Sequence, residues 1–300
     1  MKKLSVVMAA AVSLVLVATA FAGVGNITYT VHNMSSTNPG NITRNMASSY
    51  ETEICVFCHT PHNARVSVPL WNKVLPDTGA AWNMYTSSQT LSTAAKSVTA
   101  PGPESLLCLS CHDGRTAINV VSNSRNPYAL QVNGKYVIPM GTPTDWNDFN
   151  TGLPPANSSE GLPAQIGYSM GSFDALTGGS MASNLGKSKM GLLGSTSDYY
   201  YGRNLTNDHP ISFSYTAAQG QEPTKLNDIA TVKAKSGNAI RFFANGANQN
   251  TIECSSCHDP HVPYGFDSQG KSTGVGDPNL RPFLVMSNQG SALCFACHNK

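Results

Sequence analysis

Residues 55–62 read Cys-Val-Phe-Cys-His-Thr-Pro-His, and residues 254–261 repeat the pattern as Cys-Ser-Ser-Cys-His-Asp-Pro-His. The C-x-x-C-H core occurs twice more, as CLSCH at 108–112 and CFACH at 294–298. These four motifs use all eight cysteines of the 300-residue chain, which are Cys55, Cys58, Cys108, Cys111, Cys254, Cys257, Cys294 and Cys297.

The C-x-x-C-H motif is the attachment signature of c-type haem. Cysteines at i and i+3 share one face of a helical turn, so both thiols can form thioethers to one porphyrin edge. The next histidine can then ligate the iron. Disulfides or two zinc sites could use the cysteines, but neither explains a histidine after the second cysteine in all four cases. We therefore predict four covalently bound c-type haems, with proximal iron ligands His59, His112, His258 and His298.

The other four histidines number one for each predicted haem. They are His32, His62, His209 and His261, and we predict them as distal iron ligands. His62 and His261 each follow a proline, which disfavours helix at the residue before it, so each should turn away from its own porphyrin towards a neighbouring haem. Exposed turn histidines remain the alternative at His62, His261 and His209, and His32 lies near the chain end, where disorder is common. Methionine ligation is a minor alternative.

The motifs also read as an internal duplication. Each half has a lone histidine, then C-x-x-C-H-x-x-H, then a plain C-x-x-C-H. The simplest assignment of distal to proximal ligand pairs His32 with His59, His62 with His112, His209 with His258, and His261 with His298.

Helix-length amphipathic periodicity is scarce, so the predicted fold is mostly irregular. We expect short α-helices at the haem motifs, a few short β-hairpins and four haems that form the core. One hairpin is predicted over 129–138, with Asn133-Gly134 at its turn. A second is predicted from 230–233 and 239–243.

The predicted organisation begins with a signal peptide over 1–22, because Met1-Lys2-Lys3 precedes an apolar run and Ala20-Phe21-Ala22. An N-terminal dihaem module over 23–125 follows. A Gly, Ser, Asn and Pro-rich connecting segment occupies 126–199, and a C-terminal dihaem module occupies 200–300. The chain is therefore expected to be exported. No later stretch approaches the roughly 20 apolar residues of a membrane span. The 19 basic and 17 acidic residues give no charge bias towards nucleic acid.

Several stretches resemble the doubled-CXXCH multihaem cytochromes c of metal-reducing bacteria. They are CVFCHTPHNA at 55–64, Pro69-Leu70-Trp71-Asn72, CLSCHDG at 108–114 and NDHPISF at 207–213. Haem number, chain length and secretion are most similar to the tetrahaem outer-surface cytochromes of that group. The resemblance implies bis-histidine haems and little regular secondary structure. It also implies electron transfer to extracellular acceptors such as iron oxides.

Some of these relatives polymerise into filaments in which a histidine of one subunit ligates a haem of the next. The resemblance makes His32 the candidate for that role here, beside a terminal haem at Cys294–His298. The predicted partners are therefore redox proteins, extracellular acceptors and further copies of this chain.

The histidine count favours an electron-transfer protein over an enzyme, because eight histidines match eight axial positions. The expected function is extracellular electron transfer by hopping between haems, in a polymeric filament at the cell surface. A soluble periplasmic carrier is the first alternative. A multihaem reductase is the second, and it would need an iron with an open position, which this count does not provide.

Overall fold

A computed structural model describes residues 26–38, 48, 50–62, 70–76, 82–86, 88–112, 119–132, 134–138, 205–206, 208–266 and 272–299. The predicted signal peptide and most of the predicted connecting segment lie outside these residues. All eight cysteines and all eight histidines lie within them.

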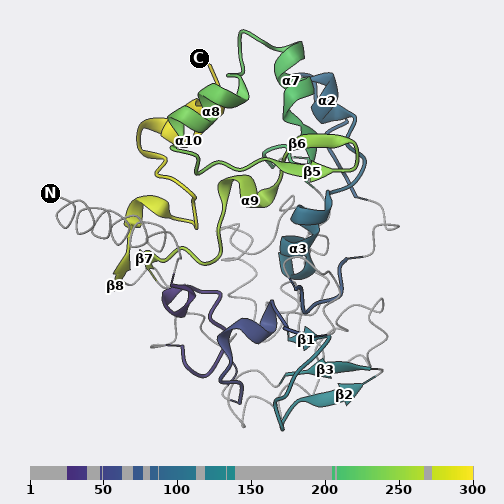
Figure 1. Cartoon of the computed structure of the whole chain (residues 1–300), viewed down its shortest axis with the longest axis vertical. Coiled ribbons are helices and arrows are strands. Elements are labelled where there is room, and N and C mark those ends of the chain that lie inside the picture. Colours follow the sequence, from purple (N-terminus) through teal and green to yellow (C-terminus); the bar gives the residue numbers. More distant parts are fainter. Residues whose placement is uncertain are drawn as a thin grey trace, which may run out of the picture.

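The described elements form two groups that meet at a pair of helices (Figure 1). Near the lower end lie η1 (Ile27–Tyr29), η3 (Ile54–Phe57) and a sheet of β1 (Val120–Val121), β3 (Lys135–Val137) and β2 (Leu130–Val132). Towards the upper end lie α2 (Thr93–Lys96), α7 (Tyr215–Gln221), α8 (Ile229–Lys235) and α10 (Ala292–Cys297). Between the groups, α3 (Pro103–His112) packs against α9 (Cys254–Cys257).

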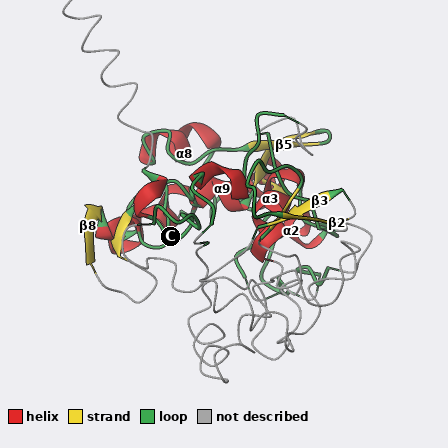
Figure 2. Cartoon of the chain, turned by 90° about the horizontal axis from the view of Figure 1, so that it is seen from below, coloured by secondary structure: helices red, strands yellow, loops and turns green. Residues whose placement is uncertain are grey.

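The remaining strands make two small antiparallel sheets. One has the order β4 (Phe213–Ser214), β6 (Asn248–Ile252), β5 (Phe243–Asn245). The other pairs β7 (Tyr264–Phe266) with β8 (Ser272–Gly276), near the single turns η5 (Pro278–Leu280) and η6 (Gln289–Ser291). Seen from below, β8 lies at the opposite side of the chain from β2 and β3 (Figure 2).

Each C-x-x-C-H motif lies on or ends a short helical turn, as its spacing predicts. The turns are η3, α3, α9 and α10, and α3 is the longest at 10 residues. In the C-terminal half the turn ends at the proximal histidine, because His258 and His298 have extended backbone angles. The turn thus ends at His258, one residue earlier than Asp259, although the effect of Pro260 on the preceding residue alone predicts an end at Asp259.

The predicted hairpin at 129–138 is present. Leu130 pairs with Val137 and Val132 with Lys135, and Gly134 has a φ of 73°, which suits glycine in a tight turn. Because β3 also pairs with β1, this part of the predicted connecting segment belongs to the sheet of the N-terminal half.

The second predicted hairpin is wrong. Residues 229–235 form helix α8, in which the Asp228 carboxylate accepts a hydrogen bond from the Thr231 N–H at 2.8 Å. This N-cap and the lysines in the last turn favour helix over strand. The hairpin of this region is instead β5–β6, which turns at Gly246 with a φ of 58°.

Many of the buried apolar side chains in the described residues belong to two modest clusters. One gathers Trp82, Met84, Tyr85, Leu106, Leu109 and Leu205. The other gathers Ala95, Phe213, Tyr215, Ala218, Val232, Ile240, Ile252 and Ala296. Each cluster reaches a motif helix through Leu106 and Leu109 of α3 or Ala296 of α10. These clusters therefore hold α3 and α10, two of the turns that carry the cysteines.

Candidate functional site

The eight cysteines lie in pairs at four short helical turns as free thiols. None of the eight forms a disulfide. Burial raises the pKa of Cys58 and of Cys257 to about 12, and that of Cys297 to about 11. A thiol with such a pKa is a poor nucleophile at neutral pH.

The histidines come together in pairs. In each of three pairs, one ring belongs to a C-x-x-C-H motif and the other to a histidine outside the motifs. The ring centroids are 6.0 Å apart for His32 and His112, 6.3 Å for His59 and His261, and 6.4 Å for His209 and His298.

These separations are those of two imidazoles that share one metal. An imidazole nitrogen binds a transition metal at about 2.0–2.1 Å, and the nitrogen lies roughly 1.1 Å from its own ring centre for ring bonds near 1.35 Å. Two opposed ligands on one iron therefore place the ring centroids roughly 6.3 Å apart. Interplanar angles do not affect this separation, because each ring can rotate about its metal bond.

In three histidine rings, the contact with a neighbouring group involves Nδ1 and leaves Nε2 available. The Nδ1–H of His209 donates to the Pro210 carbonyl at 2.9 Å, and the Nδ1–H of His258 donates to the Pro282 carbonyl at 2.9 Å. The Nδ1 of His261 lies 2.8 Å from a carboxylate oxygen of Asp259. A partner on Nδ1 fixes the tautomer and presents Nε2 as a metal ligand.

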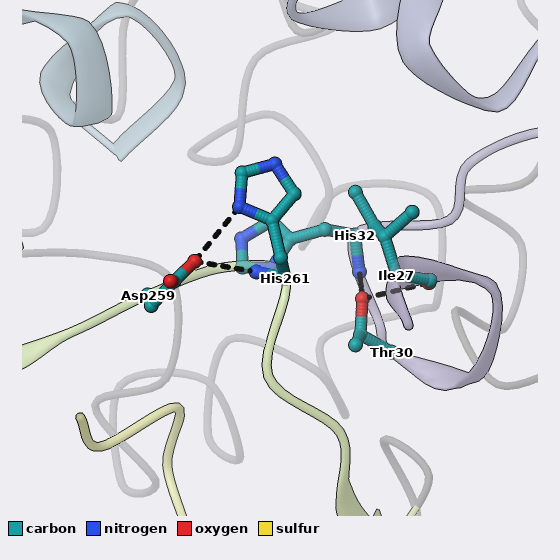
Figure 3. Close-up of polar contacts among 5 residues, drawn as sticks. All are labelled: Ile27, Thr30, His32, Asp259 and His261. Carbon is teal, nitrogen blue, oxygen red and sulfur yellow. Dashed lines mark hydrogen bonds and ion pairs between the residues drawn. The ribbon is translucent and has the colours of Figure 1, made fainter. Parts of the chain in front are cut away.

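His32 lies where an uncharged, metal-binding imidazole would be expected. It neighbours His261 and Asp259 (Figure 3), and its ring packs against Phe283 at 4.6 Å between centroids. Its Nδ1 is buried without a hydrogen-bond partner. Desolvation, reinforced by His112 and His261, lowers the pKa of His32 to about 3. The ring is therefore neutral at physiological pH and available to a metal.

A recurring backbone clamp holds three of the proximal histidines. The residue before each histidine accepts a backbone hydrogen bond from a second segment, and the residue after it donates one back. For His59 these bonds are Asn72 N to Cys58 O at 2.8 Å and Thr60 N to Leu70 O at 2.9 Å. Equivalent bonds pair His258 with Leu284 and His298 with Leu226. The clamp fixes where each imidazole leaves the backbone.

Two asparagines reinforce this clamp. The Asn72 side-chain amide donates to the Val56 carbonyl at 2.6 Å, inside the first motif. The Asn227 amide donates to the carbonyls of Phe295 at 3.2 Å and Ala296 at 3.0 Å, inside the fourth. Neither residue was predicted as a site residue. The only sequence signal was the Trp71-Asn72 stretch, since asparagine is frequent throughout the chain.

The four motifs follow one another in space in the order of the sequence. After burial, the next largest cause that raises the pKa of Cys58 is the nearby Cys111 thiol, and for Cys257 it is the nearby Cys297 thiol. Cys108 and Cys254 are joined by a hydrogen bond between their thiols. Neighbouring motifs are thus in direct electrostatic contact, and groups attached to them would form one continuous series.

The observed pairs differ from the simplest sequence assignment. His32 faces His112 instead of His59, His209 faces His298 instead of His258, and His261 faces His59 instead of His298. The His32 ring also packs against Phe283 of its own chain, and its expected role in a neighbouring subunit stays a prediction.

His62 and His258 remain outside the pairs. Both are exposed, and no imidazole ring lies in contact with either one in the described part of the chain. The carbonyl of His62 accepts a hydrogen bond from Thr60 at 2.9 Å, which fixes its backbone but not its ring.

No family model matches the chain, and no curated protein matches it. Among the described residues, no three or more His, Cys, Asp or Glu side chains gather where a bare metal ion could bind. Over the same residues, no helix has the length and apolar character needed to cross a bilayer.

Proposed function

We propose that this chain is a tetrahaem c-type cytochrome that carries electrons from haem to haem outside the cytoplasm. The observation that carries the proposal is the set of three imidazole pairs at 6.0–6.4 Å. Each unites a histidine that follows a C-x-x-C pair with one that does not, as bis-histidine haem ligation requires. Bound haem would supply one-electron iron chemistry, and the chain's own residues would hold, orient and space it.

The serial order of the motifs supports a carrier over an isolated redox centre. Electrons entering near Cys55 would have neighbouring sites through Cys108 and Cys254 to Cys294 near the chain end. Both terminal motifs expose a cysteine, Cys55 and Cys294, and Phe295 beside the last one is 43% exposed. Donor and acceptor proteins, a mineral surface, or further copies of this chain could therefore approach either end.

We further propose that the chain acts at the cell surface as a homopolymer, with a soluble periplasmic carrier as the alternative. His62 and His258 are exposed and have no opposing imidazole among the described residues. They therefore favour contact between copies through these two residues over contact through His32. His258 lacks an opposing imidazole in its own chain, and His62 of another copy is an exposed histidine free to supply one. A reductase is the competing hypothesis, because it too would have an open axial position on the haem at His258.

Electron paramagnetic resonance of the oxidised, haem-loaded protein tests the proposal. A carrier with three intact pairs should give three low-spin haems in dilute single chains. The haem at His258 should be high-spin in single chains and become low-spin on assembly. A reductase would keep the high-spin signal in every assembly state and would bind nitrite or hydroxylamine there. Absence of low-spin haem altogether would overturn the proposed function.

A further inference from the structure

Among the described residues, Glu253 is the carboxyl side chain buried where α3 packs against α9. It directly precedes Cys254 on α9, and its side chain is 1% exposed. Its Oε2 accepts a hydrogen bond of 2.5 Å from Ser105, one turn before Cys108 on α3. It accepts a second bond of 2.7 Å from Ser212, which precedes β4. One carboxylate therefore joins the second motif, the third motif and the C-terminal sheet.

Two hydroxyl groups are oriented to donate hydrogen bonds to Glu253. The Ser105 oxygen accepts the Cys254 N–H at 3.1 Å, and the Ser212 oxygen accepts the Gly102 N–H at 2.7 Å. Each hydroxyl that accepts a backbone N–H in this way has its own hydrogen left to donate to Glu253. Oε2 therefore accepts two hydrogen bonds, and such bonds favour the charged form of a carboxyl group.

The pocket is closely fitted to this group. A Cβ at position 102 would lie 2.6 Å from the Glu253 Oε1, so Gly102 leaves the space that the carboxylate fills. Thr251 lies 3.0 Å from the same oxygen. In the described residues, no lysine, arginine or histidine forms an ion pair with Glu253. Among these residues, the Glu253 carboxyl group therefore contacts neutral hydrogen-bond donors and no cationic side chain.

Glu253 also affects the pKa of a neighbouring carboxyl group. Burial, and then the charge of Glu253, raises the pKa of Glu104 on α3. The exposed Glu53 provides a natural contrast, because it lies two residues before Cys55 at the first motif but is surrounded by water. Water screens an exposed charge far more than a buried one.

We propose that Glu253 is a fixed buried charge that lowers the reduction potentials of the two central haems, those attached at Cys108–Cys111 and Cys254–Cys257. This rests on the proposed tetrahaem function. A reduced haem iron carries one unit less positive charge than an oxidised one, so a nearby anion in a low-dielectric site disfavours reduction. Net charge and burial are established determinants of the potential of redox centres in proteins. Electrons would then cross a low-potential centre between two higher-potential ends.

Glu253→Gln removes the charge and keeps the shape. Haem-resolved redox titration by paramagnetic NMR should show both central midpoints raised, by about tenfold in the one-electron equilibrium, which corresponds to about 59 mV. The matched control Glu53→Gln should leave the haem at Cys55 within a third of that shift. Ser105→Ala removes a hydrogen bond but keeps the charge, so its central midpoints should stay or fall. A merely structural role would move them alike in Glu253→Gln and Ser105→Ala.

The outcomes separate this inference from the proposed function. Intact mass of each variant reports haem attachment first, and chains without haem would overturn the proposed function itself. Haem-loaded Glu253→Gln with unshifted central midpoints would overturn the role of Glu253 alone. Should this variant not fold, the wild-type titration decides: the two central haems must be reduced at lower potentials than the haem at Cys55, and the opposite order refutes the inference.

Discussion

His62 and His261 occupy the same place in two copies of one motif, yet their surroundings differ. His261 lies 6.3 Å from His59 in the other half of the chain, and the Asp259 carboxylate holds its Nδ1 at 2.8 Å. His62 is exposed, and its motif has Thr60 where the other has Asp259. A threonine hydroxyl is bonded to the His62 backbone, so the His62 ring keeps its freedom. The residue that follows the first histidine of each motif, Thr60 or Asp259, thus separates a free imidazole ring from a fixed one.

The largest expected effect comes from removing the fixed ligand. His261→Ala should leave the haem at His59 with one axial ligand, which converts one haem in four from low to high spin in single chains and in assemblies alike. The His62→Ala variant is the matched control. It should change nothing in dilute single chains and should block low-spin conversion only in assembled protein. Equal effects of the two variants in single chains would contradict the claim that His261 is fixed and His62 is free.

A smaller effect is expected when Asp259 is replaced by alanine. Loss of a carboxylate partner on a metal-bound imidazole costs about 10–100-fold in ligand affinity. Added imidazole or carbon monoxide should therefore displace His261 at correspondingly lower concentration, measured by absorption spectroscopy. The converse change, Thr60→Asp, should order the His62 ring without weakening any haem. An Asp259→Ala protein with unchanged ligand exchange would show that the carboxylate does not hold the ring.

The asparagine clamp allows the two halves to be compared by stability. Asn72 is fully buried and bonds Val56, Asn123 and the Cys58 carbonyl, whereas Asn227 is only half-buried. Asn72→Ala leaves two buried carbonyls without a donor and should cost about 1–3 kcal/mol in the free energy of unfolding. Asn227→Ala should cost less, because water can reach its carbonyls. Denaturant titration measures both, and the reverse order would contradict the account.

The smallest effect concerns the dependence of stability on pH. His32 has a pKa of about 3 in the folded chain against an ordinary value of 6.5. Below pH 6.5 the unfolded chain binds a proton that the folded chain does not, so stability falls as the pH falls towards 3. Iron bound to the same imidazole, as proposed, would act in the same direction. Between pH 7 and 4, the free energy of unfolding measured by denaturant titration should depend less steeply on pH in His32→Gln, by the slope that one proton contributes. An unchanged slope would show that the His32 ring is exposed to water.

Local features were predictable from the sequence, and long-range ones were not. The C-x-x-C spacing and Asn133-Gly134 act over a few residues, and both predicted the local structure that is observed. Residues 230–233 were misassigned because the Asp228 cap was overlooked. The pairing of His32 with His112 depends on contacts between distant segments, which sequence order does not encode. The roles of Asn72 and Glu253 depend on burial, which is not visible in a chain rich in similar residues.

The intact mass of the protein secreted by its native host tests the central claim most directly. The account predicts a single species at the mass of the processed chain plus four haems, with no free thiol left to alkylate. Denaturation should not remove the added mass, since thioethers are covalent. A chain at its bare polypeptide mass, with its cysteines free, in disulfides or released from zinc by a chelator, would contradict the account.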